Sequence, residues 1–376
     1  MNGSRVAVEP FDSLRHAGGR PTGHALLKQE YDDFQVDEIA GFAFTGGGEH
    51  LCVKVRKTDL TTTELARRIA RVYDVSAADV GYAGMKDKRA ICTQWYSIRK
   101  PGRTGLDPQL LQDELVQVIQ VAENSRKIQI GSHKGNSFRI RLRSVSGPRQ
   151  EIEQRLDTIA AQGVPNYYGA QRFGHAMNNV HEALAVFGAM SGAEAPPSQR
   201  YSLKLRMLVS AARAYLFNQV LSHRVAEDSW AGRLPGEVFN LDGTARFFSP
   251  RADEDGAVLD RRLAELDIHG TGPLAGRLVA GARYQPGAAV AALESEILAR
   301  HGTLHRGLLH MGLEASRRSL RLAVRNLQYS WPQADTLELG FELAAGGYAT
   351  SVLRELCNTT VPDTGRELGD GDTAET

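Results

Sequence analysis

Two stretches of the chain alternate between apolar and polar residues. In residues 51–57, Leu51, Val53 and Val55 stand at every second position, and residues 336–343 repeat this spacing with leucine and phenylalanine. Side chains of a β-strand point to opposite faces in turn, so a period of two predicts strands with one buried face. We therefore expect two half-buried strands, one near each end of the chain.

Other stretches carry apolar residues three or four positions apart, which is typical of amphipathic helices. Residues 61–76 place Leu65, Ile69 and Val72 on one face, and the threonines at the start of this stretch offer an N-cap. Further helices are predicted over residues 150–162, 202–227, 286–301 and 348–359.

The element types change along the chain, from mostly strands to mostly helices and back to a strand and a helix. The long helix at 202–227 lies in the middle section, and Leu208, Ala212 and Leu216 predict one buried stripe along it. The last strand and helix resemble the first section more than the middle. We infer a fold of the α+β class, in which a domain built from both ends of the chain is interrupted by a mostly helical insertion.

The composition is that of an ordinary globular protein. The chain has 376 residues, more than one average domain, with 42% hydrophobic and 24% charged residues. No apolar run approaches the roughly 18 residues of a membrane-spanning helix, and the first residues lack the apolar segment of a secretory signal. Cys52, Cys92 and Cys357 lie far apart and form no CxxC pair. This favours reduced thiols in a cytoplasmic protein over a disulfide framework or a zinc site.

Basic residues are concentrated in one segment, although the net charge of the whole chain is only +1. Residues 124–149 contain seven basic residues and no acidic one. Within this segment Arg139, Arg141 and Arg143, here called the arginine row, alternate with apolar residues, so that a strand would carry them on one face. The row predicts a phosphate-binding surface. The alternative is a solvated face whose arginines pair with acidic neighbours.

The end of the chain has the opposite charge. From Asp363 to Thr376 there are five acidic residues and one arginine, together with glycines and threonines. Segments of this composition cannot bury enough apolar surface to fold. We expect a disordered acidic tail.

A carboxylate with three basic neighbours is the main candidate for chemistry. Asp87 lies in the sequence GMKDKRA, beside Lys86, Lys88 and Arg89, in a loop that precedes a predicted strand. Neighbouring cations favour an ionised carboxylate, which can act as a nucleophile or a base toward an anionic substrate. On the local sequence alone, a surface turn with local ion pairs is the other interpretation.

Seven segments of the chain resemble, in the same order, the signature segments of the TruD family of tRNA pseudouridine synthases. They span about residues 26–359 and read LLKQEYDDFQVDE, GYAGMKDKRAICTQWYSI, KGNSFRIRLR, GVPNYYGAQRFG, LVSAARAYLFNQVL, RRSLRLAVRNL and FELAAGGYATSVLREL. No single segment is decisive, but seven in this order are very specific. The N-terminal arm, the stretch around 228–300 and the acidic tail match less well.

The resemblance implies an isomerase that converts uridine to pseudouridine in tRNA, at position 13 in the bacterial members, without a cofactor or a metal. It implies that Asp87 is the nucleophile and that Lys86 and Lys28 belong to the catalytic motifs. The family's substrate-pocket residues are matched by Phe34, Asn136, Phe138 and Phe341. Aromatic rings offer a stacking surface to a detached uracil, and an amide offers it a donor and an acceptor. Alternatively, the phenylalanines are ordinary core residues of alternating strands.

Further arginines are candidates for contacts with tRNA phosphates. Besides the arginine row they are Arg172, in the GAQRFG segment, and Arg317, Arg318 and Arg321, in the segment SRRSLRLAVRN. Solvation of these side chains without an RNA contact is the alternative for each of them.

The resemblance also implies domain boundaries. Residues 1–165 and 312–359 are expected to form a pseudouridine-synthase-type catalytic domain with a central, mostly antiparallel sheet. Residues 166–311 are expected to form an inserted α+β TRUD domain, and residues 360–376 the tail. We expect tRNA as the partner of a monomeric protein. A catalytically silent RNA-binding protein or RNA chaperone is the alternative function. An RNA methyltransferase is not favoured, because it would need a glycine-rich cofactor loop after a parallel strand, and the sequence offers none.

Overall fold

The structure is a computed structural model and describes residues 8–99, 107–190, 201–251, 254–278 and 284–362. These residues form two units, and each unit is assembled from three separate segments of the chain. The first, here called the sheet unit, consists of residues 22–153, 324–349 and those from 357 onward. The second, here called the helical unit, consists of residues up to 21, 154–323 and 350–356. The mixture of helices and strands confirms the predicted α+β class.

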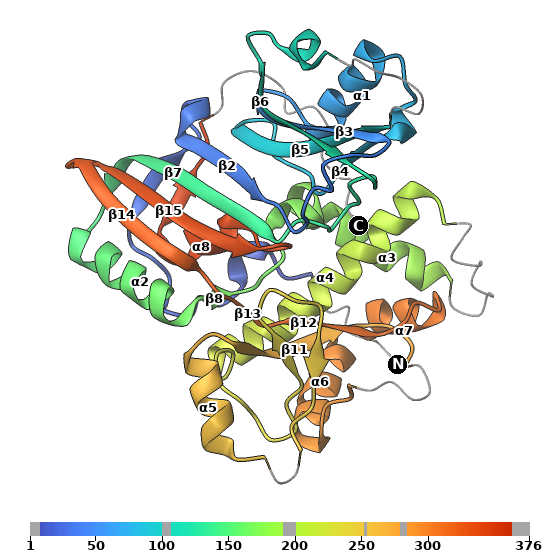
Figure 1. Ribbon diagram of the computed structural model, residues 1–376. Coiled ribbons are helices and arrows are strands. Elements are labelled where there is room, and N and C mark those ends of the chain that lie inside the picture. Colours follow the sequence, from blue (N-terminus) through green and yellow to red (C-terminus); the bar gives the residue numbers. More distant parts are fainter. Residues whose placement is uncertain (1–7, 100–106, 191–200, 252–253, 279–283, 363–376) are drawn as a thin grey trace. The chain divides into compact units, whose positions relative to one another are not determined.

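The sheet unit is built on a ten-stranded sheet with the strand order β14-β15-β7-β2-β5-β3-β6 (Figure 1). Off this path, β1 pairs with β7 and β16, and β4 pairs with β5. The strands are β1 His24–Leu27, β2 Phe34–Ile39, β3 His50–Thr58, β4 Val80–Tyr82, β5 Ile91–Arg99, β6 Val116–Asn124, β7 Gly135–Ser146, β14 Arg325–Gln333, β15 Thr336–Ala344 and β16 Asn358–Thr360. β2 runs parallel to β5, and β1 to β16. The other described pairs in this sheet are antiparallel, which confirms the expected mostly antiparallel sheet.

Helix α1, Thr62–Val72, packs on β3 and β5 in the sheet unit. Thr61 is its N-cap, as predicted, because its side chain accepts a hydrogen bond from the Glu64 N–H group. Leu65 and Ile69 are fully buried in one apolar cluster with side chains of β3 and β5. The predicted amphipathic pattern therefore places α1 over one face of the sheet.

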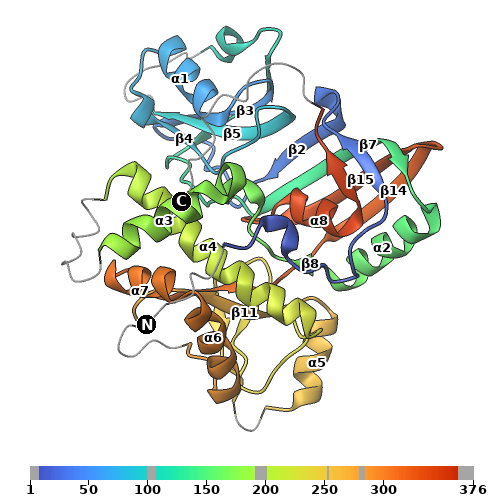
Figure 2. The same cartoon turned by 180° about the vertical axis from the view of Figure 1, so that it is seen from behind.

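The helical unit combines a group of helices with a small sheet, as Figure 2 shows. The four-stranded sheet has the order β10-β9-β11-β12, and β8 pairs with β13. The helices are α3 Asn178–Ala189, α4 Leu203–Ala226, α5 Gly256–Ala264, α6 Ala288–Arg300 and α7 Gly302–His310, and α2 Arg149–Gln162 and α8 Ala349–Leu356 span the segment boundaries. The strands are β8 Val164–Pro165, β9 Phe239–Leu241, β10 Phe247–Phe248, β11 Ile268–Leu274, β12 Ser316–Ser319 and β13 Arg321–Leu322.

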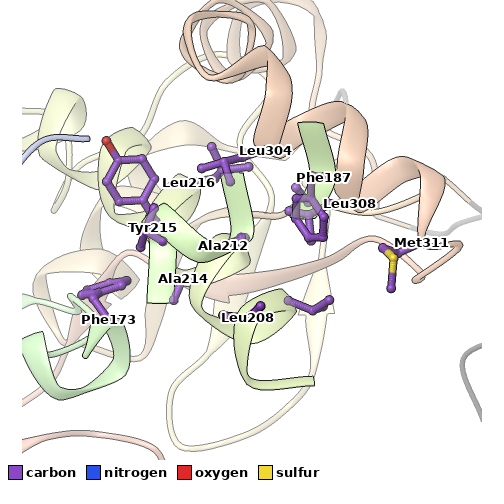
Figure 3. Close-up of a cluster of buried hydrophobic side chains, with 14 of the residues drawn as sticks. Phe173, Phe187, Leu208, Ala212, Ala214, Tyr215, Leu216, Leu304, Leu308 and Met311 are labelled. Atoms are coloured by element: carbon purple, nitrogen blue, oxygen red, sulfur yellow. The ribbon is translucent and has the colours of Figure 1, made fainter. Parts of the chain in front are cut away.

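Helix α4 is buried around most of its circumference, rather than along the single stripe that the sequence predicts. Besides Leu208, Ala212 and Leu216, its neighbours on other faces are buried as well. It contacts α3, α6, α7 and β11, and Figure 3 shows side chains of α3, α4 and α7 meeting in this core. At one contact Gly307 of α7 is required, because a Cβ atom there would lie 2.3 Å from the ring of Phe187.

The predicted boundaries of the inserted domain, 166–311, stay a prediction. The helical unit is larger, because it also takes in residues 154–165 and 312–323. The acidic tail from Asp363 and most of the small-residue segment 189–199 lie outside the described residues. Among the described helices, none has the length and hydropathy needed to cross a membrane.

Candidate active site

Three phenylalanines that the sequence singles out meet on one face of the sheet unit. The register places Phe341 of β15 opposite Phe138 of β7, and Phe34 of β2 opposite Ile140. The rings of Phe138 and Phe341 are stacked, with centroids 5.3 Å apart, and Phe34 meets Phe138 edge-on at 6.2 Å. Their exposed fractions are 3% for Phe34, 6% for Phe138 and 2% for Phe341. This burial agrees with the interpretation of the three rings as core residues, and stacking on a base stays a prediction.

Asn136 lies on the same face, two residues before Phe138 on β7. It stands opposite Glu38 of β2 and Leu343 of β15. Its Oδ1 atom is buried and has no hydrogen-bond partner among the described residues. Buried polar atoms are nearly always bonded, so such an atom calls for an explanation. A side-chain amide oxygen in this position can accept a hydrogen bond from an N–H group of a ligand.

The carboxylate of Asp87 is paired with Lys28, a residue distant in the sequence. Lys28 Nζ lies 2.5 Å from Asp87 Oδ2, and the exposed fractions of the two side chains are 14% and 45%. The same ammonium lies 4.2 Å from the ring centroid of Phe34. Lys28 follows β1 and has a φ of 58°, a conformation that costs a non-glycine residue about 1–2 kcal/mol. The pair thus connects the loop of Asp87 to the face with the phenylalanines.

The three basic neighbours of Asp87 in the sequence have other partners, which corrects the expected source of its cation. Lys86 Nζ pairs with Glu38 at 3.1 Å, and Lys88 Nζ lies 3.7 Å from Glu64. Arg89 donates to the backbone carbonyl of Pro362 at 2.9 Å. Proximity in sequence therefore does not make these side chains partners of the carboxylate.

Lys86 and Glu38 form a buried ion pair beneath the loop. Their side chains are only 3% and 0% exposed. Glu38 also accepts a hydrogen bond from the backbone N–H of Trp95 on β5, at 3.2 Å. Burial, and to a lesser extent the Lys86 ammonium, lowers the pKa of nearby His133, so that imidazole is neutral at pH 7. Lys86 is therefore placed to hold the loop rather than to contact Asp87.

Three buried polar residues that the sequence analysis missed contact the loop that carries Asp87. Lys57 donates to the backbone carbonyl of Asp87, Thr62 accepts from the N–H of Lys86, and Gln94 donates to the carbonyl of Gly84. For Lys57 the sequence contained a signal, because 57 continues the series of inward positions 51, 53 and 55 on its strand. A lysine at an apolar position of this kind needs buried acceptors.

Each member of the arginine row is paired with a carboxylate of the sheet unit. The row faces away from Phe138 and Ile140, as the alternation predicts. The pairs are Arg139 with Asp37 at 3.3 Å, Arg141 with Glu338 at 2.7 Å and Arg143 with Asp33 at 2.8 Å. These contacts favour the ion-pair interpretation over phosphate binding, since the three charges are already balanced.

The arginines of the SRRSLRLAVRN segment are mostly interior residues of the helical unit. Arg317 is 9% exposed and pairs with Glu294 at 2.5 Å. Arg321 is 4% exposed and donates to His269 Nδ1 at 2.9 Å and to two backbone carbonyls. Their burial and bonds favour a structural role over the predicted contact with RNA.

Arg318 and Arg172 lie around one tyrosine of the same unit. The guanidinium of Arg318 is 4.2 Å from the ring centroid of Tyr168 and donates to Asn166 Oδ1 at 2.7 Å. Arg172 lies 5.4 Å from the same ring and donates to Ser210 Oγ at 3.0 Å. Both side chains are half-buried, and their predicted contacts with RNA stay predictions.

The described residues contain no group of three or more His, Cys, Asp or Glu side chains that could hold a metal ion. The cysteine nearest the loop is Cys92, which is buried and lies 3.5 Å from the carbonyl oxygen of Asp87. Burial raises the pKa of its thiol to about 11. Cys92 is therefore a thiol at neutral pH and not a nucleophile.

Comparisons with known proteins agree on one family. A family profile described as tRNA pseudouridine synthase D (TruD) matches residues 16–186 and 200–356. A protein named tRNA pseudouridine synthase D from Pseudomonas entomophila is 43% identical over 340 residues, which cover 90% of this chain and 93% of that protein. A protein of the same name from Methylococcus capsulatus is 42% identical over 348 residues, covering 92% and 94%.

A solved structure has the same fold. The crystal structure described as tRNA pseudouridine synthase D (TruD) from Methanosarcina mazei aligns with a TM-score of 0.68 and covers 89% of this chain and 94% of that one. At 23% sequence identity this likeness concerns the fold alone.

Proposed function

Because the chain belongs to the TruD family of tRNA pseudouridine synthases, we propose that it isomerises a uridine of tRNA with Asp87 as the nucleophile. The observation that carries the proposal is the pair of Asp87 and Lys28, which adjoins the face with Phe34, Phe138 and Asn136. A carboxylate at this place has little use in a protein that merely binds RNA, because it repels the phosphates. By family resemblance the substrate is the uridine at position 13.

The reaction breaks the N-glycosidic bond of uridine, turns the uracil and joins its C5 atom to C1′ of the sugar. A half-exposed carboxylate such as Asp87 can attack C1′, attack C6 of the uracil, or remove the C2′ proton to give a glycal. All three routes are redox-neutral and use the same oxygen atoms.

Lys28 is the residue that we propose to orient the nucleophile. Its ammonium holds Asp87 Oδ2 at 2.5 Å, which leaves the second carboxylate oxygen to face the substrate. The contact of the same ammonium with the ring of Phe34 fixes the lysine in turn. Lys86 stabilises the loop through its buried ion pair with Glu38.

The uracil must stay bound while it is detached from the sugar, and the target base must leave its stack in the RNA. We propose that Asn136 holds the uracil edge, because its buried Oδ1 lacks a protein partner among the described residues and can accept the N3–H of the base. Phe34, Phe138 and Phe341 would then form the apolar wall beside it. We propose further that the protein acts as a monomer in the cytoplasm.

The test is the substitution Asp87→Asn, which keeps the shape of the side chain and removes the nucleophile. We expect no pseudouridine in uridine-labelled tRNA transcripts, mapped by carbodiimide treatment and primer extension, while tRNA binding is retained. Asp37→Asn is the matched control, since Asp37 is 41% exposed, lies on the opposite face of the sheet unit and pairs with Arg139. It should keep wild-type turnover.

An Asp87→Asn variant that keeps about a tenth or more of the wild-type kcat would overturn the role of Asp87. The alternative, a silent RNA-binding protein or RNA chaperone, predicts instead that the wild-type protein forms no pseudouridine in any tRNA transcript. The same mapping reveals whether the modified uridine is at position 13.

A further inference from the structure

Buried side chains form hydrogen bonds with the backbone of the loop that carries Asp87. In Gly84–Ala90 the backbone groups of Gly84, Lys86 and Asp87 are bonded to residues of β5, α1 and β3, respectively. Backbone groups of most loops bond to water or to one another. Here the bonding partners are buried polar side chains, and this arrangement concerns the one loop from which the proposed nucleophile projects.

Lys57 is the most unusual of these partners. It is a residue of β3 with an exposed fraction of 0%, and its ammonium donates to the carbonyl of Asp87 at 3.0 Å and also to that of Leu60. Burying a charged ammonium is costly unless polar groups surround it. Leu60 immediately precedes Thr61, the N-cap of α1, so the lysine ties the start of this helix to the residue that carries the carboxylate.

A second set of bonds holds the loop just before Asp87. Thr62 Oγ1 accepts from the N–H of Lys86 at 2.8 Å and donates to Gln94 Oε1 at 2.9 Å. The amide of Gln94 in turn donates to the carbonyl of Gly84 at 3.0 Å. Thr62 and Gln94 are both 0% exposed. Lys57 adds a bond to the backbone carbonyl of Asp87 itself.

We infer that Lys57 is a positioning residue for the catalytic carboxylate, an inference that rests on the proposed function of Asp87. Lys57 holds the backbone carbonyl of Asp87, and Lys28 holds its carboxylate. The carboxylate is therefore defined by two ammonium groups that act on opposite ends of the same residue. Without Lys57 the carbonyl of Asp87 loses a charged donor, and the loop can turn so that the carboxylate no longer points at the sugar or the base.

The experiment compares Lys57→Met, which keeps a long unbranched side chain and removes its charge and donors, with Lys57→Gln, which keeps one donating amide. The rate is measured in single turnover with the enzyme in saturating excess over tRNA, so an inactive fraction of enzyme does not change the rate constant. Displacement of a reacting group by about 1 Å can cost roughly 10²-fold in rate. We expect a loss of this order for the Met variant, an intermediate rate for the Gln variant, and an unchanged dissociation constant for tRNA in both.

Lys54→Met is the matched control, because Lys54 lies on the same strand at a position of opposite parity and is only partly buried. It should have the wild-type rate. Folding of each variant is checked by circular dichroism and thermal unfolding. If the Met variant does not fold, the Gln variant decides the question.

Several results would overturn the inference. A folded Lys57 variant with the wild-type single-turnover rate would do so, as would a loss of rate explained wholly by weaker tRNA binding. If neither variant folds, Lys57 serves the stability of the sheet unit and not the position of Asp87. Asp87→Asn is measured in parallel. An active Asp87→Asn enzyme refutes the proposed function, whereas an inactive one beside a fully active Lys57→Met enzyme refutes the positioning role alone.

Discussion

The buried pair of Lys86 and Glu38 allows a test that separates a structural lysine from a catalytic one. The perturbations are Lys86→Met, Glu38→Gln and the two together. Each single substitution leaves one charged group in a site where the side chains are only 3% and 0% exposed. The glutamine keeps an oxygen for the Trp95 N–H group, which bonds to Glu38 in the wild type.

The magnitudes follow from the burial. Removing one partner of a buried ion pair costs about 3–5 kcal/mol, because the other charge is left uncompensated. The double substitution has no buried charge and leaves mainly one amide donor unsatisfied, which costs about 1–3 kcal/mol. The double variant should therefore be more stable than either single variant. If the two effects were independent, the free energy of unfolding would instead fall by about 6–10 kcal/mol in the double variant.

The assay has two readouts, the free energy of unfolding in urea and the single-turnover rate. We expect stability and rate to recover together in the double variant, with the rate within about tenfold of the wild type, because Lys86 acts through Glu38 and the loop. Lys88→Met with Glu64→Gln is the control pair. Those side chains are 48% and 42% exposed, and a pair of this kind contributes about 0–1 kcal/mol.

Two results would refute the reasoning. If the single effects simply add in the double variant, the two residues are not coupled and the pair does not stabilise the loop. If the stability returns while the rate stays below about a hundredth of the wild-type value, Lys86 contacts the substrate and is catalytic in its own right.

The remaining predictions concern the arginine row and the pH dependence of stability. Replacing Arg139 and Arg141 by glutamine should leave the dependence of tRNA binding on salt unchanged, because both arginines are paired within the protein; a salt slope reduced by about 2 would show that they contact phosphates. Burial, reinforced by three arginines, lowers the pKa of His16 from 6.5 to about 4. The native state thus favours the neutral form of His16. The contribution of this histidine to the stability of the protein is complete above pH 6.5 and is lost as the pH falls toward 4. In the His16→Gln variant the melting temperature should therefore change less between pH 7 and 4 than in the wild type. An equal change in the two proteins would contradict the role given to His16.

The regular elements follow from the sequence because their determinants are local. The alternation in β3 and β15 and the capping threonine of α1 are readable within about ten residues, and the structure has these elements where they are predicted. Helix α4 shows the limit of this reasoning. Its composition reveals a buried stripe, but burial on the other faces depends on α3, α6, α7 and β11, which are distant in sequence.

The sequence does not predict which charged side chains form ion pairs with one another. Asp87 has three basic neighbours in sequence, yet its partner Lys28 is 59 residues away. The arginine row has no acidic residue nearby in sequence, yet Glu338 reaches Arg141 from 197 residues away. Such pairs are fixed by the register of strands that meet only in the folded sheet. The family resemblance supplies the candidate residues of the site, and only the structure supplies their partners.

The position of β15 beside β7 has a consequence for how the protein is made. Arg141 on β7 and Glu338 on β15 are 197 residues apart, which at about 5–20 residues per second corresponds to about 10–40 s of translation. During this time β7, with its apolar residues Phe138, Ile140 and Leu142, has been synthesised, but its partner strand β15 has not. The nascent chain therefore exposes the unpaired edge of β7 until β15 is made, and a polypeptide released before β15 lacks Phe341.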